Sequence, residues 1–402
     1  MKHSKFSSFA FLLAVTVILF SACDEIESPI DINLNGPEEL SCSYFNEGTN
    51  RVLTDNPDED VDYVITCQAF VSVDLTIEPG VVIEFQNDAG LEIGEEGSIS
   101  ALGSSDKPII LTGVDKVAGS WSGVLSNSND VKNELEYVTI NYGGGSAFNS
   151  NGNKGNLILW AQTRMSIDNC TFSHSGSYGV EMAYSEYTIP SFTNNSFKNN
   201  QTPMYVIPSV VHVLDASNDF AGNTNDYVLI GCAALSEGNY TWQNINVPYR
   251  TEARDFGITR VIYVVENCNL TIEAGTRIDF GTDTGLKVNN GGSLKAIGTE
   301  TNPITFSGVD GAAGAWKGLN FDFTQSVNNQ LDRCVIEYAG SGDEDAAIYM
   351  WADPKLSVTN CVIRNIDGCV FTDAPDFGGF NNVNFSESGN TFENISGAVE
   401  CH

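Results

Sequence analysis

One block of about 195 residues occurs twice in this sequence, and that duplication constrains the fold more than any other feature. Leu75 corresponds to Leu270, a shift of 195 positions, and many later residues match in the same order. The matches at this shift include Gly90 with Gly285, Pro108 with Pro303, Gly113 with Gly308, Trp121 with Trp316, and Phe197 with Phe392. Repetition of this kind indicates two tandem copies of one structural unit.

Each copy contains a finer rhythm of short apolar runs. Residues 81–85, 91–93, 98–101 and 109–112 are rich in β-branched residues, and Gly, Asn, Asp or Pro separates them. No apolar pattern with a helical period follows the N-terminal segment, which excludes a helical domain. Short strands between frequent turns favour stacked coils, each burying its apolar side against its neighbours. We therefore expect an all-β solenoid.

Two cysteines support the stacking of coils. The string Cys-Val-Ile at residues 334–336 returns at residues 361–363, 27 positions later. This spacing predicts one turn of the solenoid, with the thiols of Cys334 and Cys361 stacked inside. Nine of the ten cysteines follow Cys23, so at least one of these thiols is unpaired if Cys23 is modified, and the pairing of the others stays open.

The motifs within each copy resemble those of the right-handed parallel β-helix proteins of the pectate-lyase-like superfamily, in particular bacterial surface lipoproteins. The resemblance covers about residues 50–400 and rests on residues 75–80, 292–298, 303–308 and 314–318. It implies a right-handed parallel β-helix (β-solenoid) made of two tandem copies of a ~195-residue unit. This scaffold carries enzymes, adhesins and binding modules, so the resemblance does not define a function.

The N-terminus predicts export. A short basic stretch precedes the apolar residues 6–20, and small residues lead to Cys23. This arrangement is typical of a secretory signal and is too short to span a membrane, so we expect a signal peptide at residues 1–22. Cys23 resembles the lipidated cysteine of bacterial lipoproteins, although Phe20 stands where that motif usually has leucine. The resemblance implies acylation of Cys23 and a lipid anchor in the membrane.

The residues after Cys23 bear on location and on domain boundaries. Their acidic character resembles the surface-export signal of lipoproteins in the Bacteroidetes group, which implies an outer-membrane lipoprotein facing the cell surface. Residues 23–48 are expected to form the lipidated cysteine and a flexible acidic tether. Residues 49–218 and 219–402 are expected to be the first and second β-helix units.

The chain is strongly acidic. It has 52 Asp and Glu residues against 19 Lys and Arg residues, a formal net charge of -33. Such a surface repels nucleic acid, and it repels anionic polysaccharides unless cations mediate the contact. We therefore expect no nucleic-acid partner. The charge also serves solubility in general, which is the simpler interpretation.

Two acidic runs are candidates for calcium, the only cofactor that the sequence suggests. Their carboxylates are the hard oxygen ligands that calcium prefers. The candidate ligands are Asp58, Asp60 and Asp62 in the first run and Asp343 and Asp345 in the second. The alternative is a pair of solvated loops, because neither run has glycines at the spacing of a calcium-binding loop.

Catalytic motifs are not recognisable in the sequence. The strings that carry the carboxylates of polygalacturonase-like hydrolases, an Asp-Asp pair, a His-Gly pair and an Arg-Ile-Lys, are absent. There is no nucleophile elbow with partners. The arginines are scattered, so a lyase site is not evident either. The sequence favours a protein that is not an enzyme but leaves the question open.

Aromatic residues that recur in both copies are the remaining candidates for ligand binding. Trp160 corresponds to Trp351, and Tyr142 corresponds to Tyr338. One interpretation makes them platforms for stacking sugars along one face of the solenoid. The alternative is that they cover the core at a coil corner, which their presence in both copies favours.

The hypothesis that fits best is a non-catalytic lipoprotein that binds glycan or a partner protein at the cell surface. One alternative is a polysaccharide lyase or glycoside hydrolase whose unrecognised active site lies on one parallel sheet. Another is a structural subunit of a surface assembly. A ladder of Asp, Arg or Lys on adjacent coils would favour the enzyme, and an exposed Trp or Thr ladder would favour binding.

Overall fold

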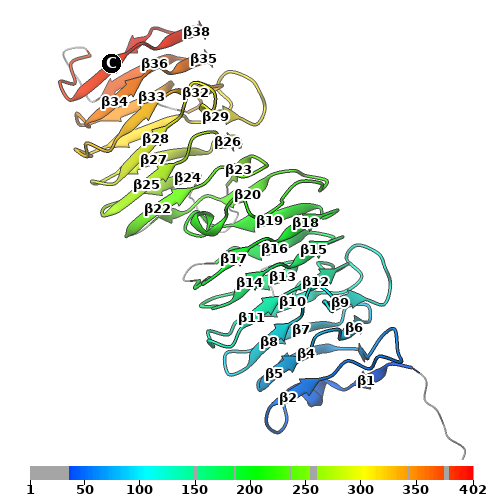
Figure 1. Cartoon of the computed structure of the whole chain (residues 1–402). Coiled ribbons are helices and arrows are strands. Elements are labelled where there is room, and N and C mark those ends of the chain that lie inside the picture. Colours follow the sequence, from blue (N-terminus) through cyan, green and yellow to red (C-terminus); the bar gives the residue numbers. More distant parts are fainter. Residues whose placement is uncertain are drawn as a thin grey trace, which may run out of the picture. The chain divides into compact units, whose positions relative to one another are not determined.

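The computed structural model describes residues 36–148, 152–184, 187–235, 237–253, 260–342, 345–374 and 380–401. Within these ranges the chain forms strands and two short 3-10 helices, η1 (Cys42–Phe45) and η2 (Val211–Val213). All pairings between the described strands are parallel (Figure 1). The predicted all-β parallel β-helix is therefore confirmed. No helix among the described residues is both long and apolar enough to cross a membrane.

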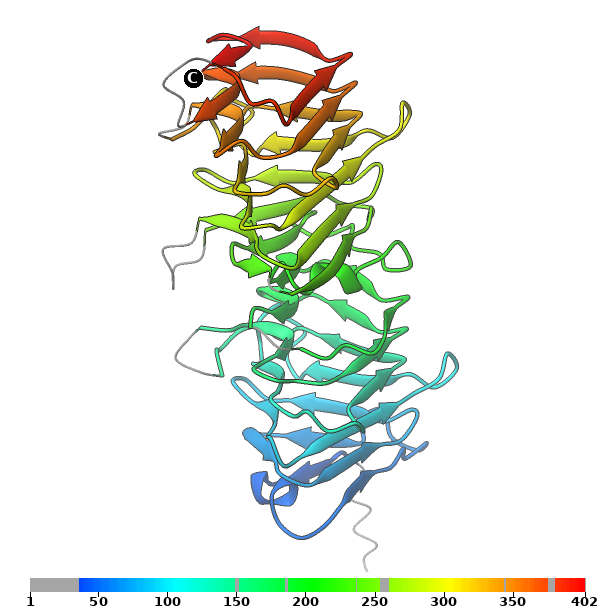
Figure 2. The same ribbon diagram turned by 90° about the vertical axis from the view of Figure 1, so that its left-hand side faces the viewer.

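One coil of the first half shows how the sequence forms the fold. β6 (Val82–Phe85), β7 (Gly90–Ile93) and β8 (Ser98–Leu102) follow each other around the coil, and β9 (Ile109–Gly113) begins the next one. β9 pairs with β6 in register, with Leu111 opposite Ile83. Alternate side chains point inward, because successive residues of a strand face opposite sides. Figure 2 shows the coils stacked in chain order.

Two sheets belong only to the first half of the chain. Sheet N1 contains β1 (Glu38–Leu40), β3 (Tyr63–Ile65), β6, β9, β12 (Val138–Asn141), β15 (Thr171–Ser173) and β18 (Ser196–Lys198). Sheet N2 contains β2 (Arg51–Leu53), β5 (Asp74–Ile77), β8, β11 (Glu134–Glu136), β14 (Ser166–Asp168) and β17 (Phe192–Thr193).

Two further sheets belong only to the second half. Sheet C1 contains β21 (Ala234–Leu235), β24 (Val261–Val264), β27 (Gly285–Asn289), β30 (Leu319–Asp322), β33 (Ala346–Trp351), β36 (Cys369–Ala374) and β39 (Glu400–Cys401). Sheet C2 contains β22 (Gly238–Trp242), β25 (Cys268–Ile272), β28 (Ser293–Ile297), β31 (Gln330–Asp332), β34 (Leu356–Thr359) and β37 (Phe385–Ser388).

The fifth sheet, here called the long sheet, has 13 strands and runs through both halves. Its first-half strands are β4 (Gln68–Val71), β7, β10 (Gly123–Ser126), β13 (Gly155–Leu159), β16 (Tyr178–Met182) and β19 (Thr202–Val206). It continues with β20 (Val228–Gly231), β23 (Tyr249–Glu252), β26 (Arg277–Phe280), β29 (Ile304–Gly308), β32 (Cys334–Glu337), β35 (Val362–Ile366) and β38 (Thr391–Ile395).

The second copy is rotated by one face relative to the first. The shift of 195 residues carries β6 onto β26, β7 onto β27 and β8 onto β28. Yet β6 lies in sheet N1 while β26 lies in the long sheet, and β7 lies in the long sheet while β27 lies in sheet C1. Strands that correspond in sequence therefore occupy different faces of the solenoid.

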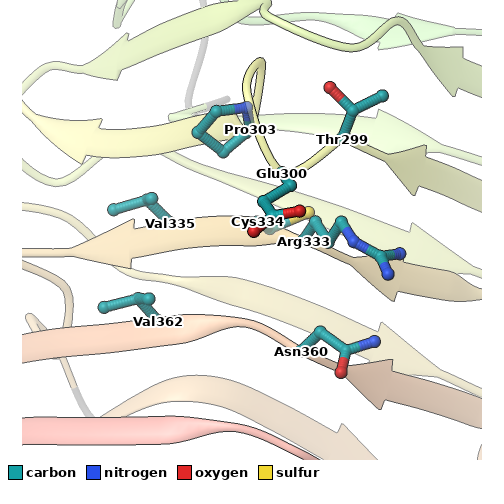
Figure 3. Close-up of a pocket in the computed structure, with 8 residues that line it drawn as sticks. All are labelled: Thr299, Glu300, Pro303, Arg333, Cys334, Val335, Asn360 and Val362. Carbon is teal, nitrogen blue, oxygen red and sulfur yellow. The ribbon is translucent and has the colours of Figure 1, made fainter.

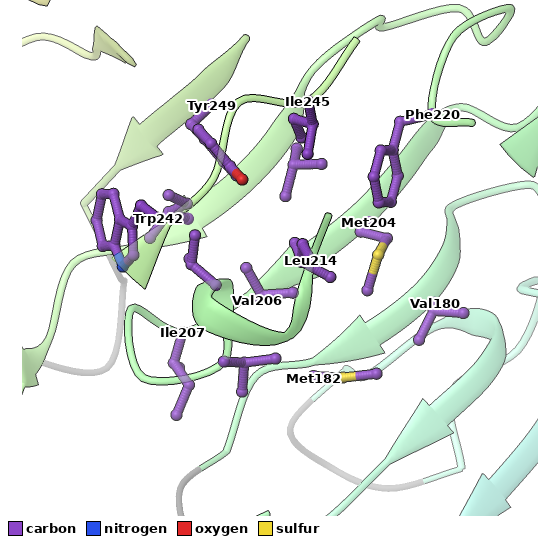
Figure 4. Packing of buried hydrophobic residues seen from close by; sticks show 14 of the residues in the cluster. Val180, Met182, Met204, Val206, Ile207, Leu214, Phe220, Trp242, Ile245 and Tyr249 are labelled. Atoms are coloured by element: carbon purple, nitrogen blue, oxygen red, sulfur yellow. The ribbon is translucent and has the colours of Figure 1, made fainter. Parts of the chain in front are cut away.

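The junction between the copies is where this rotation occurs. The first-half sheets end by Lys198 and the second-half sheets begin at Ala234, so the predicted boundary at residues 218 and 219 falls between them. Around η2 the core is filled by large side chains from both sides. Figure 4 shows Met204, Val206, Leu214, Phe220, Trp242 and Tyr249 converging there. Phe220 and Trp242 are fully buried.

Two buried tryptophans make the same contacts in both copies. Trp121 stacks on Phe85 with ring centroids 4.1 Å apart, and Trp316 stacks on Phe280 at the same 4.1 Å. The indole N–H of Trp121 donates to the Asn141 carbonyl at 2.8 Å, and the Trp316 indole makes the equivalent bond at 2.9 Å. This pair is retained because each copy needs it to fill the core.

Buried asparagines connect successive coils at the turns. The Asn200 amide donates to Asn223 Oδ1 at 2.9 Å and to the Phe172 carbonyl at 2.9 Å, and Asn200 Oδ1 accepts from the Ser175 amide at 3.0 Å. Asn195 makes a similar bond to Asn218 at 3.1 Å. Backbone N–H and C=O groups at the turns have no partner in the β-sheets, and these side chains supply their hydrogen bonds.

The compact unit begins at Gly36, which corrects the predicted boundary of the tether at residue 48. β1 pairs with β3, and Phe45 of η1 is fully buried. A disulfide joins Cys42 to Cys67. Residues 36–48 were expected to be tether because they are polar and acidic, but the buried Leu40 and Phe45, the β1–β3 pairing and one disulfide hold them against the first coil.

A second disulfide joins Cys369 to Cys401 near the other end of the stack. The remaining described cysteines are free and buried: Cys170, Cys232, Cys268, Cys334 and Cys361. The Cys334 amide lies 3.4 Å from Cys361 Sγ, and Val335 pairs with Val362. The predicted stacking of these two thiols on adjacent coils is confirmed. Cys23 and the signal peptide lie outside the described residues.

Candidate ligand-binding face

The four aromatic residues predicted to bind ligand divide into two kinds. Tyr142 and Tyr338 pack against the hydrophobic core and sit at coil corners with φ of 62° and 67°. The Tyr142 ring stacks on His174 of the next coil at 4.8 Å. Both tyrosines therefore cover the core at a coil corner, which was the alternative to a role in binding sugars.

Trp160 and Trp351 are half-buried and lie outside the core cluster. Trp160 follows β13 in line with the long sheet, and its amide donates to the Ser126 carbonyl at 2.8 Å. Trp351 ends β33 in sheet C1. The expectation that such platforms share one face is wrong for this pair, because the rotation between the copies moves the second tryptophan to another sheet.

Trp160 belongs to an aromatic pair on the outer side of the solenoid. The ring of Tyr184, which is 44% exposed, lies 4.4 Å from the Trp160 ring. The hydroxyl of Tyr187 accepts a hydrogen bond from the Tyr184 amide and donates one to the Leu159 carbonyl at 3.0 Å. These bonds hold the backbone of Tyr184 beside Trp160, so the two rings are positioned before any ligand arrives.

A polar hollow lies beside this aromatic pair. It has a volume of about 430 Å³ and is lined by Glu95, Glu96, Asn127, Asn129, Ala161 and Gln162. Because Ser126 pairs with Leu159, Asn127 lies opposite Trp160 on the neighbouring strand. The Asn127 amide donates to Glu95 Oε1 at 3.3 Å. The hollow thus presents both donors and acceptors, and Trp160 directly precedes Ala161 in its lining.

A separate hollow of about 280 Å³ shares Glu95, Glu96 and Asn127 with the first and is also lined by Gly94 and the exposed ring of Phe70. On the outer face of the same strands, Glu92 lies between Phe70 and Leu125. Burial raises the pKa of the Glu92 carboxyl. Apolar surface therefore continues from Phe70 across the sheet, with one carboxyl set into it.

Three tyrosines on adjacent strands extend the aromatic surface of the long sheet. Tyr178 on β16 lies 5.3 Å from Tyr205 on β19. Tyr227 directly precedes β20, and the guanidinium of Arg250 on β23 lies 4.8 Å above its ring. Sequence reasoning missed these residues. For Tyr205 and Tyr227 the available signal was that residues 205–259 match the repeat least well, so the fold does not require these two tyrosines in both copies.

The outer face of the long sheet also carries a ladder of ionisable residues in the second half. From β23 to β38 the register aligns Arg250, Asp279, Ser307, Glu337, Arg364 and Glu393. Glu337 is 5% exposed and accepts hydrogen bonds from Ser307 at 3.0 Å and Arg364 at 2.8 Å. Burial raises the pKa of the Asp279 carboxyl, although Arg277 opposes this effect. Acidic and basic side chains on adjacent coils are the feature that the sequence analysis named as favouring an enzyme.

The structure does not bring together those predicted calcium ligands that it describes. Asp62 is buried, and its carboxylate accepts hydrogen bonds from the Asn56 amide at 2.6 Å and the Val82 amide at 2.7 Å. Asp58, Asp60 and Asp345 are exposed, and Asp343 lies outside the described residues. Within the described part of the chain, no group of three or more His, Cys, Asp or Glu side chains is placed to hold a metal. Calcium binding stays a prediction.

Another hollow lies where sheet C2 passes into the long sheet. Figure 3 shows Val335 and Val362 side by side on neighbouring strands, with Arg333 and Asn360 where these strands begin. Glu300 and Pro303 from the preceding loop complete the lining. Arg333 pairs with Asp332. The lining has no aromatic ring. The first hollow also has none in its lining, but Trp160 directly precedes Ala161, which lines it.

No family model, no curated protein and no solved structure matches this chain. Its fold defines it as a parallel β-helix protein, and its outer face combines aromatic rings with amide and carboxylate groups. These aromatic, amide and carboxylate groups are therefore the features of the chain that bear on its function.

Proposed function

We propose that this protein is a non-catalytic lipoprotein of the outer membrane whose β-helix binds a polysaccharide at the cell surface. The observation that carries the proposal is the Trp160–Tyr184 pair beside the hollow lined by Asn127, Glu95 and Gln162. Acylation at Cys23 would hold the solenoid at the membrane, with residues 24–35 between the anchor and the first coil.

The chemistry of the site suits a sugar. The C–H face of a pyranose ring is apolar and packs against the flat surface of an indole or phenol. Its hydroxyl groups both donate and accept hydrogen bonds, as the amides of Asn127 and Gln162 and the carboxylate of Glu95 do. Aromatic surface with a few placed polar groups is the usual composition of such sites.

The charge of the chain narrows the class of polysaccharide. Glu95 and Glu96 line the hollow, and the whole chain carries a formal charge of -33. Carboxylates at this density repel an anionic ligand. We therefore propose a neutral polysaccharide as the ligand of the Trp160 site.

The test is calorimetric titration of the soluble chain from Asp24 onward with cellohexaose, xylohexaose and mannohexaose. We expect one of these neutral probes to bind. Trp160→Ala should weaken its binding to the Trp160 site at least tenfold. Val117→Ala removes an exposed apolar side chain from the loop between β9 and β10 and should leave binding unchanged. A folded wild-type protein that binds none of the probes, or a Trp160→Ala variant that keeps full affinity, would overturn the proposal.

A second candidate function is cleavage of a polysaccharide, and the ladder on the long sheet is the observation that favours it. Asp279 and Glu337 are two strands apart on this face, roughly 9.5 Å along the sheet. That separation is near the upper end for inverting glycoside hydrolases. The raised pKa of Asp279 suits a general acid.

A reducing-end assay distinguishes the two functions. Incubation of the folded protein with cellulose, xylan, mannan and polygalacturonate should release no new reducing ends if the protein only binds. New reducing ends that disappear in Asp279→Asn would establish the hydrolase instead.

A further inference from the structure

We propose that the second copy carries a second saccharide site, around Trp351 on sheet C1. This inference rests on the proposed function, because it assigns to Trp351 the role proposed for Trp160. With both sites occupied, one molecule would hold two saccharide segments on two different faces.

The local backbone of the two tryptophans is the same. Trp160 lies opposite Asn127, and Trp351 lies opposite Asp322, which occupies the position of Asn127 in the second copy. The residue after each tryptophan is an alanine with positive φ, 51° at Ala161 and 60° at Ala352. Each copy therefore presents a half-buried indole next to a short polar side chain at the end of an outer strand.

The surroundings of Trp351 add aromatic and polar surface. The ring of Tyr349 lies 6.4 Å from the Trp351 ring, with an angle of 25° between their planes. On the outer face of sheet C1 the register aligns Tyr349 with Asn320 and Lys287 on the preceding strands. A hydroxyl-rich ligand would find there a flat aromatic wall beside amide, carboxylate and ammonium groups.

Asp322 gives an independent indication of a ligand. It is 8% exposed, and its Oδ2 pairs with Lys287 Nζ at 2.5 Å. Its other oxygen, Oδ1, is buried and has no hydrogen-bond partner among the described residues. A buried acceptor without a donor is unfavourable. A ligand hydroxyl beside Trp351 could supply the missing donor.

The two sites differ in charge. Glu92, Glu95 and Glu96 of the first copy correspond, at the shift of 195 residues, to Lys287, Asn290 and Gly291. The second site thus lacks three carboxylates and gains the ammonium group of Lys287, while Asp322 and Asp353 add two carboxylates in the positions of Asn127 and Gln162. Its net charge is less negative than that of the first site, so we expect it to accept a saccharide that bears carboxylates more readily than the first site does.

Stoichiometry tests the inference. In calorimetric titration with the neutral hexasaccharide that the wild-type protein binds, we expect two molecules bound per chain. Trp351→Ala and Trp160→Ala should each leave one, and the double variant none. Hexagalacturonate should bind once, at a site that Trp351→Ala removes and Trp160→Ala retains.

A milder variant controls for folding. Tyr349→Ile introduces the residue that the first copy has at this position, Ile158, so the strand should form normally. We expect the second site to weaken about fivefold while the first keeps its affinity. One bound saccharide per wild-type chain, unaffected by Trp351→Ala, would overturn this inference and leave the proposed function intact. Binding of no saccharide at all would overturn both.

Discussion

Two pairs of tryptophans recur in the duplicated sequence, and they do different things. Trp121 and Trp316 are fully buried and stack on phenylalanines. Trp160 and Trp351 are half-buried on outer faces and do not pack in the core. Recurrence in a duplicated chain therefore indicates a structural role only after burial is known.

The first prediction concerns the stability of these two kinds of site. Trp316→Ala should lower the free energy of unfolding by about 3–5 kcal/mol, because it leaves a large cavity beside Phe280. Trp351→Ala should lower it by less, about 1–2 kcal/mol, because this half-buried indole buries only part of its apolar surface. Urea unfolding followed by circular dichroism measures both. Equal losses in the two variants would show that Trp351 supports the fold.

The second prediction concerns pH and Glu92. Burial raises the pKa of this carboxyl above its ordinary value. The unfolded chain then loses the proton at a lower pH than the folded chain, so stability falls as pH rises through this interval and stays lower at neutral pH. Glu92→Gln should have a higher Tm than the wild-type protein at pH 7.

Thermal melts at several pH values check the prediction for Glu92. The advantage of Glu92→Gln should disappear below about pH 4, where the carboxyl is protonated in both states. A variant that melts at the wild-type temperature at pH 7 would contradict the account. Asp106→Asn, at an exposed loop residue, is the matched control.

At the scale of elements, the strands of a coil are predictable from the sequence. The apolar runs at residues 91–93 and 109–112 correspond to β7 and β9, and their ends differ by one residue. Glycine, asparagine and proline break the chain often enough to mark each strand. The sheet to which a strand belongs is not predictable in this way, because it depends on pairing between coils.

Because sheet membership cannot be predicted from the sequence, only part of the candidate site was predicted. The sequence identified Trp160 as a candidate but grouped it with Tyr142, which covers a coil corner. Distinguishing the two requires knowing which residues of a coil point outward. Tyr184 and Asn127 were missed because their proximity to Trp160 arises from the stacking of three coils.

The third prediction concerns the buried asparagines that connect successive coils at the turns. Asn200→Ala removes the bonds to the Ser175 amide and the Phe172 carbonyl, both buried. Each buried group left unsatisfied is unfavourable by about 1–3 kcal/mol. We expect a loss of roughly 2–4 kcal/mol in unfolding free energy, measured by urea unfolding. Asn225→Ala, in the turn that follows this ladder, should have a smaller effect.

At the scale of the whole molecule, stability is distributed coil by coil. Each coil contacts chiefly its neighbours, so a local weakness opens the adjacent coils before distant ones. The disulfides Cys42–Cys67 and Cys369–Cys401 lie at opposite ends of the described stack. Each disulfide stabilises an end of the stack, where a coil has a neighbouring coil on one side only.

The fourth prediction follows from that placement. Replacing Cys369 and Cys401 together by serine should destabilise the last described coil by about 3–4 kcal/mol, the entropy of closing a loop of this length. Hydrogen exchange should accelerate in β36 to β39 and stay unchanged in β4 to β7. Faster exchange along the entire chain would show that the solenoid unfolds as one cooperative block.

The one-face rotation between the copies has a geometrical consequence. Each coil has three faces, and the second copy begins on the face that carries the second strand of the first copy. The duplication is thus a screw operation, a translation along the stack combined with a third of a turn. A third copy added by the same operation would occupy the one remaining orientation, and a fourth would return to the first. Gene duplication alone would then place identical surface groups on every side of such a protein.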